Sequence, residues 1–432
     1  IAGYQLFEAG SGIPIGPVES LSDEWVDLIL HTLKESERLG LEFAMHNCPG
    51  WSSSGGPWIT PDKAMQIITW SETKITGGKQ VRIQLPTPKH MFDYYIDTYC
   101  LAIPANMKVI PRLSILELSN RLDKDGVLTW DVPTGEWLIM RFGQTAKDQK
   151  NKSAPSKSTG LDCDKFSTEA LDYHLNCMFK RLMPTMEKIA KHSKIGLLID
   201  SYETGDQDWT SDMPAYFEQS HGYELYPFLP VLANKIVESE ESTKRFLFDF
   251  RRVRADMFAE RYYGHFQKRC KEKGIITYTE PYGGNMMEEL QVAQQLDINM
   301  GEFWCGQTVL WANYKYNRTV KQVASIVHTL GGKVVGAEAF TSEPDADKWL
   351  QYPYALKSLG DYMFTRGLSR IYFHRFAHQP HPTAAPGMTM GAWGLHFDRT
   401  NTWWKPGKAW IEYLNRCQYI FQSSTFYGDI LY

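Results

Sequence analysis

The sequence has no long hydrophobic run and no excess of positive charge. Its 432 residues contain no stretch of 18 consecutive apolar residues, so we predict no membrane span. The formal net charge is −4, whereas proteins that bind nucleic acid usually carry a strongly basic face. A hydrophobic content of 43% and a charged content of 22% are ordinary for a globular protein. We therefore expect neither a nucleic acid partner nor a membrane-spanning segment.

The motifs of several common sites are also missing. There are seven cysteines, an odd number, and no C-x-x-C pair, so we expect free thiols rather than a zinc site or a dense disulfide framework. No G-x-G-x-x-G or G-x-x-x-x-G-K-[ST] loop opens a predicted helix, and no G-x-S-x-G sequence marks a serine nucleophile. These absences argue against nucleotide binding and against serine-hydrolase chemistry.

Aromatic residues, in contrast, are abundant. They make up 13% of the chain and include 14 tryptophans and 23 tyrosines. Large aromatic cores are one explanation. Sugar binding is the other, because the C–H faces of a pyranose ring stack on aromatic rings whose polar ends can also form hydrogen bonds.

A short apolar stretch, a loop and an amphipathic helix follow one another repeatedly along the chain. Ser22 and Ser167 are candidate N-caps of such helices, and Gly40 and Gly274 are candidate C-caps. This alternation predicts an α/β protein with parallel strands, and seven strands approach a (β/α)₈ barrel of the TIM type. An open doubly wound sheet is the alternative. The predicted strands lie at 3–10, 41–50, 195–203, 274–284, 298–304, 333–340 and 370–378, and the helices at 23–40, 167–192, 241–274 and 320–332.

Residues 69–148 interrupt this pattern. They contain short stretches with period-2 alternation, such as "KQVRIQL" and "EWLIMRFG", separated by Gly, Pro and charged turns. We predict an inserted all-β, sandwich-like domain here. Residues 1–68 would then form the first part of a catalytic barrel and residues 149–432 the remainder, with a polar linker at 147–160.

Nearly every predicted strand ends in an acid or a histidine. Strand C-termini of a parallel barrel point to one face, where barrel enzymes have their active sites. The acids therefore belong to the rim of a cleft rather than to the barrel core. The strand-end residues are Glu8, His46, Asn47, Asp200, Glu203, Glu280, Glu302, Glu338, His374 and His378.

An acid-lined, aromatic-rich cleft suggests glycoside hydrolysis, which needs one carboxyl as a proton donor and a second as a base or nucleophile. The spacing alone does not say which two of the five acids, Asp200, Glu203, Glu280, Glu302 and Glu338, act. A carbohydrate-binding protein without catalysis is the rival hypothesis, since such a protein needs no carboxyl pair facing across a cleft.

Other residues of the cleft have more than one interpretation. Trp51, in the loop "HNCPGWSSSGGPW", and Trp304 are candidates for stacking on a sugar, and His46, Asn47, Glu280, His374 and His378 for hydrogen bonds to its hydroxyls. Surplus acids could instead hold a hard cation such as Ca²⁺, with Glu280 and Glu302 as ligands. A zinc site at His374, His378 and His381 is a weaker alternative, because the H-E-x-x-H spacing is absent.

Three segments resemble one known family. "GLEFAMHNCPGWSSSGGPWITPDKAMQ" (40–66), "IDSYETGDQDWT" (199–210) and "GAEAFTSE" (336–343) are similar to motifs of glycoside hydrolase family 106, the α-L-rhamnosidases. The resemblance covers most of the chain outside 69–148. It implies an inverting, calcium-dependent enzyme that removes terminal α-L-rhamnose from plant polysaccharides or glycosides.

The resemblance also suggests roles for individual residues. Glu203 resembles the family's general acid, Glu338 its general base, and Asp200 the acid that accompanies Glu203. Members are long, multidomain bacterial proteins, so we expect this chain to be a catalytic-domain fragment whose flanking domains are missing. Degraders of plant glycans usually work outside the cytoplasm, which predicts a periplasmic or extracellular location.

Overall fold

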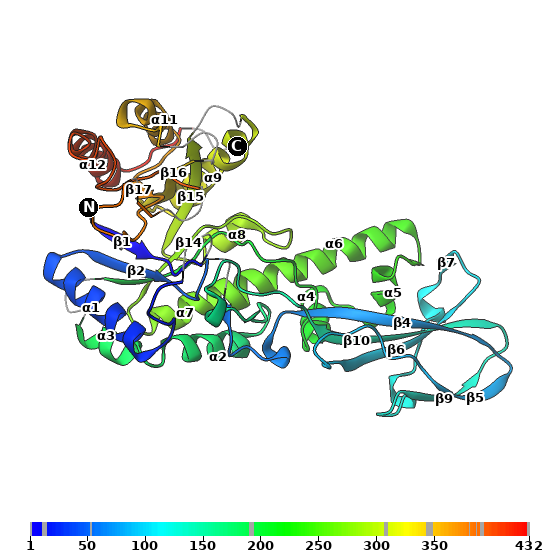
Figure 1. Ribbon diagram of the computed structural model, residues 1–432. Coiled ribbons are helices and arrows are strands. Elements are labelled where there is room, and N and C mark those ends of the chain that lie inside the picture. The colour runs from blue at the N-terminus through cyan, green and yellow to red at the C-terminus, as the bar shows by residue number, and fades with distance from the viewer. Residues whose placement is uncertain are drawn as a thin grey trace.

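A computed structural model describes most of the chain (Figure 1). The helices among the described residues are too short or too polar to cross a membrane. The description covers residues 2–10, 15–51, 54–189, 194–305, 310–342, 349–379, 381–385, 387–388 and 393–429, with the backbone alone for 310–317.

The centre of the molecule is a seven-stranded sheet in which all neighbouring strands are parallel. It curls into a nearly closed barrel. Arg370 on the last strand forms an ion pair with Glu42 on the second, and Gln5 on the first donates a hydrogen bond to Met300 on the fifth. In spatial order the strands are β1 (Gly3–Leu6), β2 (Glu42–His46), β12 (Ile195–Ile199), β14 (Ile276–Thr279), β15 (Ile298–Cys305), β16 (Val335–Ser342) and β17 (Arg370–Phe373).

The α/β class and the parallel strands predicted from the sequence are confirmed, whereas the eightfold barrel is not. The described residues contain seven strands of this sheet, and no eighth strand closes the circle between β1 and β17. Side chains alternate across each strand, as the pleat requires. On β12, Leu198 joins a cluster with Ala44, Tyr278 and Met300, whereas Leu197 and Ile199 pack into the larger core that includes the helices. A strand that is apolar on both faces is expected where helices cover a parallel sheet.

Helices follow the strands and cover the barrel. The predicted caps are present: Ser22 accepts a hydrogen bond from the Trp25 amide, and Gly40 adopts a left-handed conformation with φ 66°. The helix predicted at 241–274 is divided by a π-helical turn, η6 (Phe258–Gly264). The longer helices are α1 (Asp23–Leu39), α2 (Thr168–Phe179), α3 (Met183–Ile189), α4 (Met213–His221), α6 (Glu240–Met257), α7 (His265–Lys271), α9 (Leu310–Thr329), α11 (Pro353–Thr365) and α12 (Lys408–Ser423); α5 (Leu229–Leu232) and α8 (Glu289–Ala293) are short.

A β-rich region extends away from the barrel (Figure 1). Its antiparallel sheet has the order β4-β10-β6-β8, and β5 pairs with β9. One set of its side chains belongs to the core that contains Phe246 and Phe250 of α6, and another set forms a separate cluster around Trp130. The division into domains stays a prediction. The strands are β4 (Gln66–Thr76), β5 (Lys79–Gln84), β6 (Ile96–Pro104), β7 (Val109–Ile110), β8 (Leu116–Glu117), β9 (Val127–Val132) and β10 (Glu136–Ala146), and β7 also pairs with β13 (Ile236–Val237).

A short two-stranded sheet connects the loop after β2 to the segment that follows the β-rich region. Its strands are β3 (Gly55–Gly56) and β11 (Leu161–Asp162). Glycine is needed at this contact, because a Cβ atom on Gly55 would lie 2.6 Å from the carbonyl oxygen of Leu161. The loop that carries the "HNCPGW" motif is thus held against a distant part of the chain, close to the ends of β2 and β12.

Candidate active site

Four carboxyl groups come from consecutive strands of the barrel. Asp200 and Glu280 follow directly after β12 and β14, whose last residues Ile199 and Thr279 pair with each other. Glu302 on β15 and Glu338 on β16 are register partners. Oxygen atoms of Asp200, Glu280 and Glu338 lie within 4.8 Å of one another. The parallel register therefore gathers acids that are up to 138 positions apart in the sequence, and Asp200, at the end of the buried strand β12, is one of them.

Burial and mutual repulsion govern the protonation of this group. Desolvation raises the pKa of Asp200 well above its usual value, and the negative charge of Glu338 adds to this effect. Desolvation likewise raises the pKa of Glu280, with further contributions from Asp200, Glu338 and Glu302. Without a cation, this arrangement favours protonated carboxyls at pH values at which exposed acids are ionised.

Glu302 is turned toward different neighbours. Its Oε1 accepts a hydrogen bond from Trp304 Nε1, and its Oε2 lies 3.0 Å from the hydroxyl of Tyr282. The same hydroxyl contacts Oε2 of Glu280. Since one hydroxyl has a single proton to donate, the second of these contacts requires a proton on one of the two carboxyls. Burial, followed by repulsion from Glu338, raises the pKa of Glu302, which is consistent with a shared proton.

The predicted metal ligands, Glu280 and Glu302, stay a prediction, but their surroundings differ. The sequence suggested Glu280 and Glu302, but both oxygens of Glu302 are engaged by Trp304 and Tyr282. Of the described residues, Asp200, Glu280 and Glu338 form the group whose ligand atoms come close enough to hold one ion. Strand spacing alone could not reveal this, because it depends on how each side chain is turned.

Glu338 is the most accessible member of the group. Its side chain is 20% exposed, and its Oε1 accepts a 2.6 Å hydrogen bond from the hydroxyl of Thr341. His374 Nδ1 lies 3.6 Å from the same oxygen. Burial lowers the pKa of His374, and the nearby Glu338 only partly opposes this effect, so His374 is predominantly neutral at pH 7. Glu338 thus faces a neutral histidine and a hydroxyl while part of it stays open to solvent.

Glu203 lies on the loop after β12, outside this group. It forms an ion pair with Lys152, and Ser201 donates a 3.2 Å hydrogen bond to its Oε1. Its side chain is 36% exposed. The charge of Glu203 also contributes to the raised pKa of Asp200, after burial and Glu338. Glu203 therefore lies near the buried carboxyls but is itself partly open to solvent.

His46 and Asn47 were predicted to contact a sugar, which stays a prediction, and both side chains are buried. His46 is 2% exposed; its Nε2 accepts a 3.4 Å hydrogen bond from the Asp200 amide, and burial lowers its pKa to about 4. Asn47 is completely buried, donating to the Leu198 carbonyl and accepting from Ser54 and His174. Both residues hold the end of β12 through hydrogen bonds to the Asp200 amide and the Leu198 carbonyl.

Aromatic rings border the strand ends. Trp304 is partly exposed and contacts Trp393 edge to face, with ring centroids 5.6 Å apart. Trp51 is also partly exposed, and its amide donates to the carbonyl of Lys152. His378 is exposed and belongs to no group of possible metal ligands among the described residues. Sequence reasoning missed Trp393 and Tyr282; the position of Tyr282 two residues after Glu280, in "TEPYGG", was the available signal.

Glu8, at the end of β1, faces a separate cavity of about 130 Å³. Burial raises the pKa of its carboxyl. His46 is the connection between this cavity and the carboxyl group, since it lines the cavity and also contacts the Asp200 amide. The cavity is lined by Leu6, Phe7, Glu8, Trp25, Ile29, Met45, His46, Cys48 and Met178.

Comparison with known proteins adds independent information. The family model described as alpha-L-rhamnosidase matches residues 1–98 and 89–432. A protein of Formosa agariphila named "putative beta-glucuronidase" is 38% identical over 458 residues, covering 99% of this chain and 38% of that protein. The solved rhamnosidase of Novosphingobium sp. PP1Y superposes with a TM-score of 0.90 at 21% identity, over 98% of this chain and 57% of its own.

A mannanase of Thermotoga petrophila is far less similar, with a TM-score of 0.30 at 9% identity over 61% of this chain and 83% of its own. This chain spans 38% of the length of the Formosa agariphila protein and 57% of the length of the solved rhamnosidase, less than two thirds in both cases. The high TM-score shows that the barrel and the β-rich region together reproduce a fold already seen in a rhamnosidase.

Proposed function

The chain belongs to glycoside hydrolase family 106, the α-L-rhamnosidases, and from this premise we propose that it is the catalytic part of an inverting glycosidase that releases terminal α-L-rhamnose. The observation that carries the proposal is the convergence of Asp200, Glu280 and Glu338 within 4.8 Å at the strand ends, with the solvent-accessible Glu203 on the same loop as Asp200. A protein that only binds sugars has no need for so many buried carboxyls, which are costly to desolvate.

In this proposal Glu203 is the general acid. It is accessible enough to exchange protons with solvent between turnovers, and Ser201 and Lys152 hold its carboxyl at the rim. Since Lys152 pairs with the charged form of Glu203, a bound substrate has to separate them before Glu203 can protonate the leaving oxygen. Glu338 is the general base. Thr341 orients its carboxyl, and its open side leaves room for the water that attacks the opposite face of the sugar.

A calcium ion fits the buried part of the site. Ca²⁺ prefers several carboxylate and carbonyl oxygens, and Asp200, Glu280 and Glu338 offer three carboxyls. Glu280 Oε1 is buried and has no hydrogen-bond partner among the described residues, as expected of an atom that awaits a ligand. When bound, the ion would neutralise the gathered charge and could ligate a sugar hydroxyl. Glu338 could remain the base while only one of its oxygens lies near the ion.

The partner in this proposal is a carbohydrate whose terminal sugar enters between the strand ends and the rim tryptophans. Trp51, Trp304 and Trp393 are suited to stacking on its C–H faces. We also propose that flanking domains of the same longer protein accompany this part, and that the protein works in the periplasm or outside the cell, where plant glycans are degraded.

The name of the Formosa agariphila relative makes a β-glucuronide the substrate to test beside the rhamnoside. Aryl α-L-rhamnoside and aryl β-D-glucuronide should be incubated with the protein in Ca²⁺ and in chelator, and the anomer of the released sugar followed by NMR. We expect rhamnoside cleavage to the β-anomer, dependent on Ca²⁺. Cleavage of the glucuronide alone would support a glycosidase but reject rhamnose as the sugar that it removes. Release of the α-anomer would reject the inverting mechanism.

The residue roles are tested by substitution. On a rhamnoside with a poor, alkyl leaving group, Glu203→Gln and Glu338→Gln should each reduce kcat by about 10²–10⁴-fold, the usual contribution of an acid or base. Glu224→Gln is the matched control, because Glu224 is exposed in the segment between α4 and α5. A folded Glu203→Gln variant with full activity on this alkyl rhamnoside would remove Glu203 from the mechanism.

A further inference from the structure

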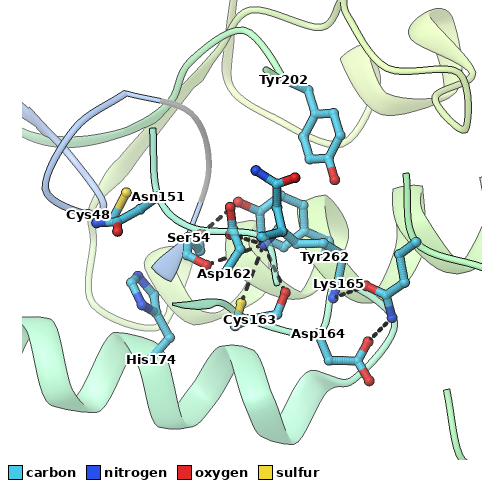
Figure 2. A network of polar contacts seen from close by, with 12 residues as sticks. Cys48, Ser54, Asn151, Asp162, Cys163, Asp164, Lys165, His174, Tyr202 and Tyr262 are labelled. Carbon is cyan, nitrogen blue, oxygen red and sulfur yellow. Dashed lines mark hydrogen bonds and ion pairs between the residues drawn. The ribbon is translucent and has the colours of Figure 1, made fainter. Parts of the chain in front are cut away.

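A completely buried ion pair lies behind the loops that carry the carboxyls. Lys165 and Asp162 both have side chains with 0% exposure, and they form an ion pair within the segment Asp162–Lys165, here called the hub (Figure 2). Lys165 Nζ also donates to the Cys163 carbonyl at 2.9 Å and lies 5.2 Å from the centre of the Tyr262 ring. Burial lowers the pKa of Lys165, but Asp162, with contributions from Cys163 and Cys48, outweighs this effect and raises the pKa, so the lysine is charged.

A first chain of hydrogen bonds, here called the first arm, connects the hub to the loop after β2. Lys165 Nζ donates to the Ser54 carbonyl at 3.2 Å, and the Ser54 hydroxyl donates to Asn47 Oδ1 at 2.5 Å. Tyr262, on the π-helical turn η6, lies 2.7 Å from the same hydroxyl. Asn47 in turn donates through both its side-chain amide and its backbone amide to the carbonyl of Leu198, two residues before Asp200. This arm therefore ends on the strand that presents Asp200.

The second arm reaches the loop after β12. The backbone amide of Lys165 donates to Gln207 Oε1 at 2.9 Å, and Gln207 donates to Asp164. Thr210 adds a 2.8 Å hydrogen bond to the other oxygen of Asp164. Gln207 lies four residues after Glu203. A single four-residue segment thus contacts both loops at the candidate active site, one through its lysine ammonium and the other through Asp164 and a backbone amide.

We propose that Lys165 and Asp162 are positioning residues, which fix the loop after β2 and, through Ser54 and Asn47, the end of β12 that presents Asp200. The effect on turnover rests on the proposed function, whereas the effect on loop order does not. Stability alone is a weak explanation for the pair, because replacing a buried ion pair by neutral groups often leaves stability unchanged or improved. Neutral groups at positions 162 and 165 would, however, lack the lysine ammonium that donates a hydrogen bond to the Ser54 carbonyl.

The decisive comparison removes both charges at once. Lys165→Met with Asp162→Asn eliminates the ion pair without leaving an unpaired charge, so we expect a cooperatively folded protein with a Tm close to the wild-type value. We expect at least tenfold faster hydrogen–deuterium exchange in peptides spanning 44–48 and 197–203, and at least a tenfold lower kcat with KM changed by less than threefold. Lys165→Met alone should lower Tm, because Asp162 would stay buried without its cation.

Ser54→Ala tests the same path without touching the ion pair. It removes the hydroxyl between Asn47 and Tyr262 and should increase exchange in both peptides and lower kcat in the same direction. If the double variant does not fold, this variant decides by the same readings. Lys157→Met is the control: its exposed ion pair with Glu19 lies outside the hub, and no reading should change.

Wild-type exchange and wild-type kcat in the folded variants would overturn the proposal. Faster exchange with an unchanged kcat would also overturn it, since the hub would then order the loops without positioning a reacting group. If the wild-type protein cleaves no glycoside, the proposed function fails, and the exchange measurements alone then decide whether the hub orders the two loops.

Discussion

Glu302 and Glu338 are register partners on the neighbouring strands β15 and β16, yet their carboxyls contact different residues. Glu338 joins Asp200 and Glu280, whereas Glu302 is held by Trp304 and Tyr282. Equivalent positions in the barrel therefore have unequal roles, which leads to a direct comparison between variants.

The Ca²⁺ affinity should distinguish Glu280 from Glu302. Glu280→Gln removes a proposed ligand and should weaken Ca²⁺ binding by about 10–100-fold, which is also the range found for changes in the groups that support a metal site. Glu302→Gln can still accept from Trp304 and can donate to Tyr282, so its affinity should stay within threefold of the wild type. Isothermal titration calorimetry on both variants measures this; equal losses would reject the assignment of ligands.

Tyr282 should contribute to stability through its hydroxyl. Tyr282→Phe leaves buried carboxyl oxygens of Glu280 and Glu302 without this donor, and such a loss typically costs about 1–3 kcal/mol. Urea unfolding in chelator should therefore show a lower free energy of unfolding with an unchanged m-value. Tyr354→Phe is a suitable control because its side chain is exposed. Equal stability of the Tyr282 variant would mean that the two carboxyls satisfy each other without the hydroxyl.

Without Ca²⁺, the buried carboxyls should lower stability as the pH rises through their raised pKa values. The pKa values of Asp200, Glu280 and Glu302 are raised in the folded protein, which therefore binds more protons than the unfolded chain. These groups favour folding at low pH, and that contribution is lost as the pH rises through their raised pKa values. Ca²⁺ should restore the loss, because it replaces the protons as the neutralising charge.

Two buried histidines have the opposite effect at lower pH. The pKa of His46 is about 4 and that of His174 about 3, below the ~6.5 of an unfolded histidine, so their contribution is complete by about pH 7. Thermal unfolding from pH 7 to 8 thus avoids these histidines and lies below the ~8.5 at which unfolded cysteines ionise, which matters because burial raises the pKa of Cys100, Cys163 and Cys270. Asp200→Asn should flatten the decline in chelator; a Tm that rises over this range in the wild type would contradict the raised pKa values.

The acid role of Glu203 should depend on the leaving group. A Glu203→Gln variant cannot protonate the departing oxygen, so it should lose most activity on a glycoside with a poor leaving group. It should lose little on an aryl glycoside whose phenol ionises readily. The ratio of kcat/KM for two such substrates, compared with the same ratio for Glu338→Gln, separates acid from base. A uniform loss on both substrates would argue against Glu203 as the acid.

Asn47 should act on folding rather than on sugar binding. Asn47→Ala removes the side-chain amide that donates to the Leu198 carbonyl and the side-chain oxygen that accepts from Ser54, a buried loss worth about 1–3 kcal/mol. We expect a lower Tm, with KM for the rhamnoside within about threefold of the wild type. A large rise in KM at unchanged Tm would instead return Asn47 to the substrate contacts that its sequence position suggested.

Local patterns in the sequence were enough to predict the class of fold, the strand ends and the acids on them. Alternating strands and helices imply parallel strands, and parallel strands place Asp200, Glu280 and Glu338 at one end, so local patterns were sufficient. Capping residues such as Ser22 and Gly40 were also readable, because their interactions lie within one turn of the helix.

The tertiary structure decided which of these residues meet. Glu302 is turned away by Trp304 and Tyr282, and His46 and Asn47 are buried behind β12, although both follow the same strand-end pattern as the acids. The role proposed for Lys165 could not be predicted from the sequence. It depends on a contact with Ser54, 111 positions away, and on a completely buried ion pair with Asp162. Periodicity predicts the face of a strand or helix on which a side chain lies. Burial and hydrogen bonds between distant parts of the chain determine which groups its polar atoms contact.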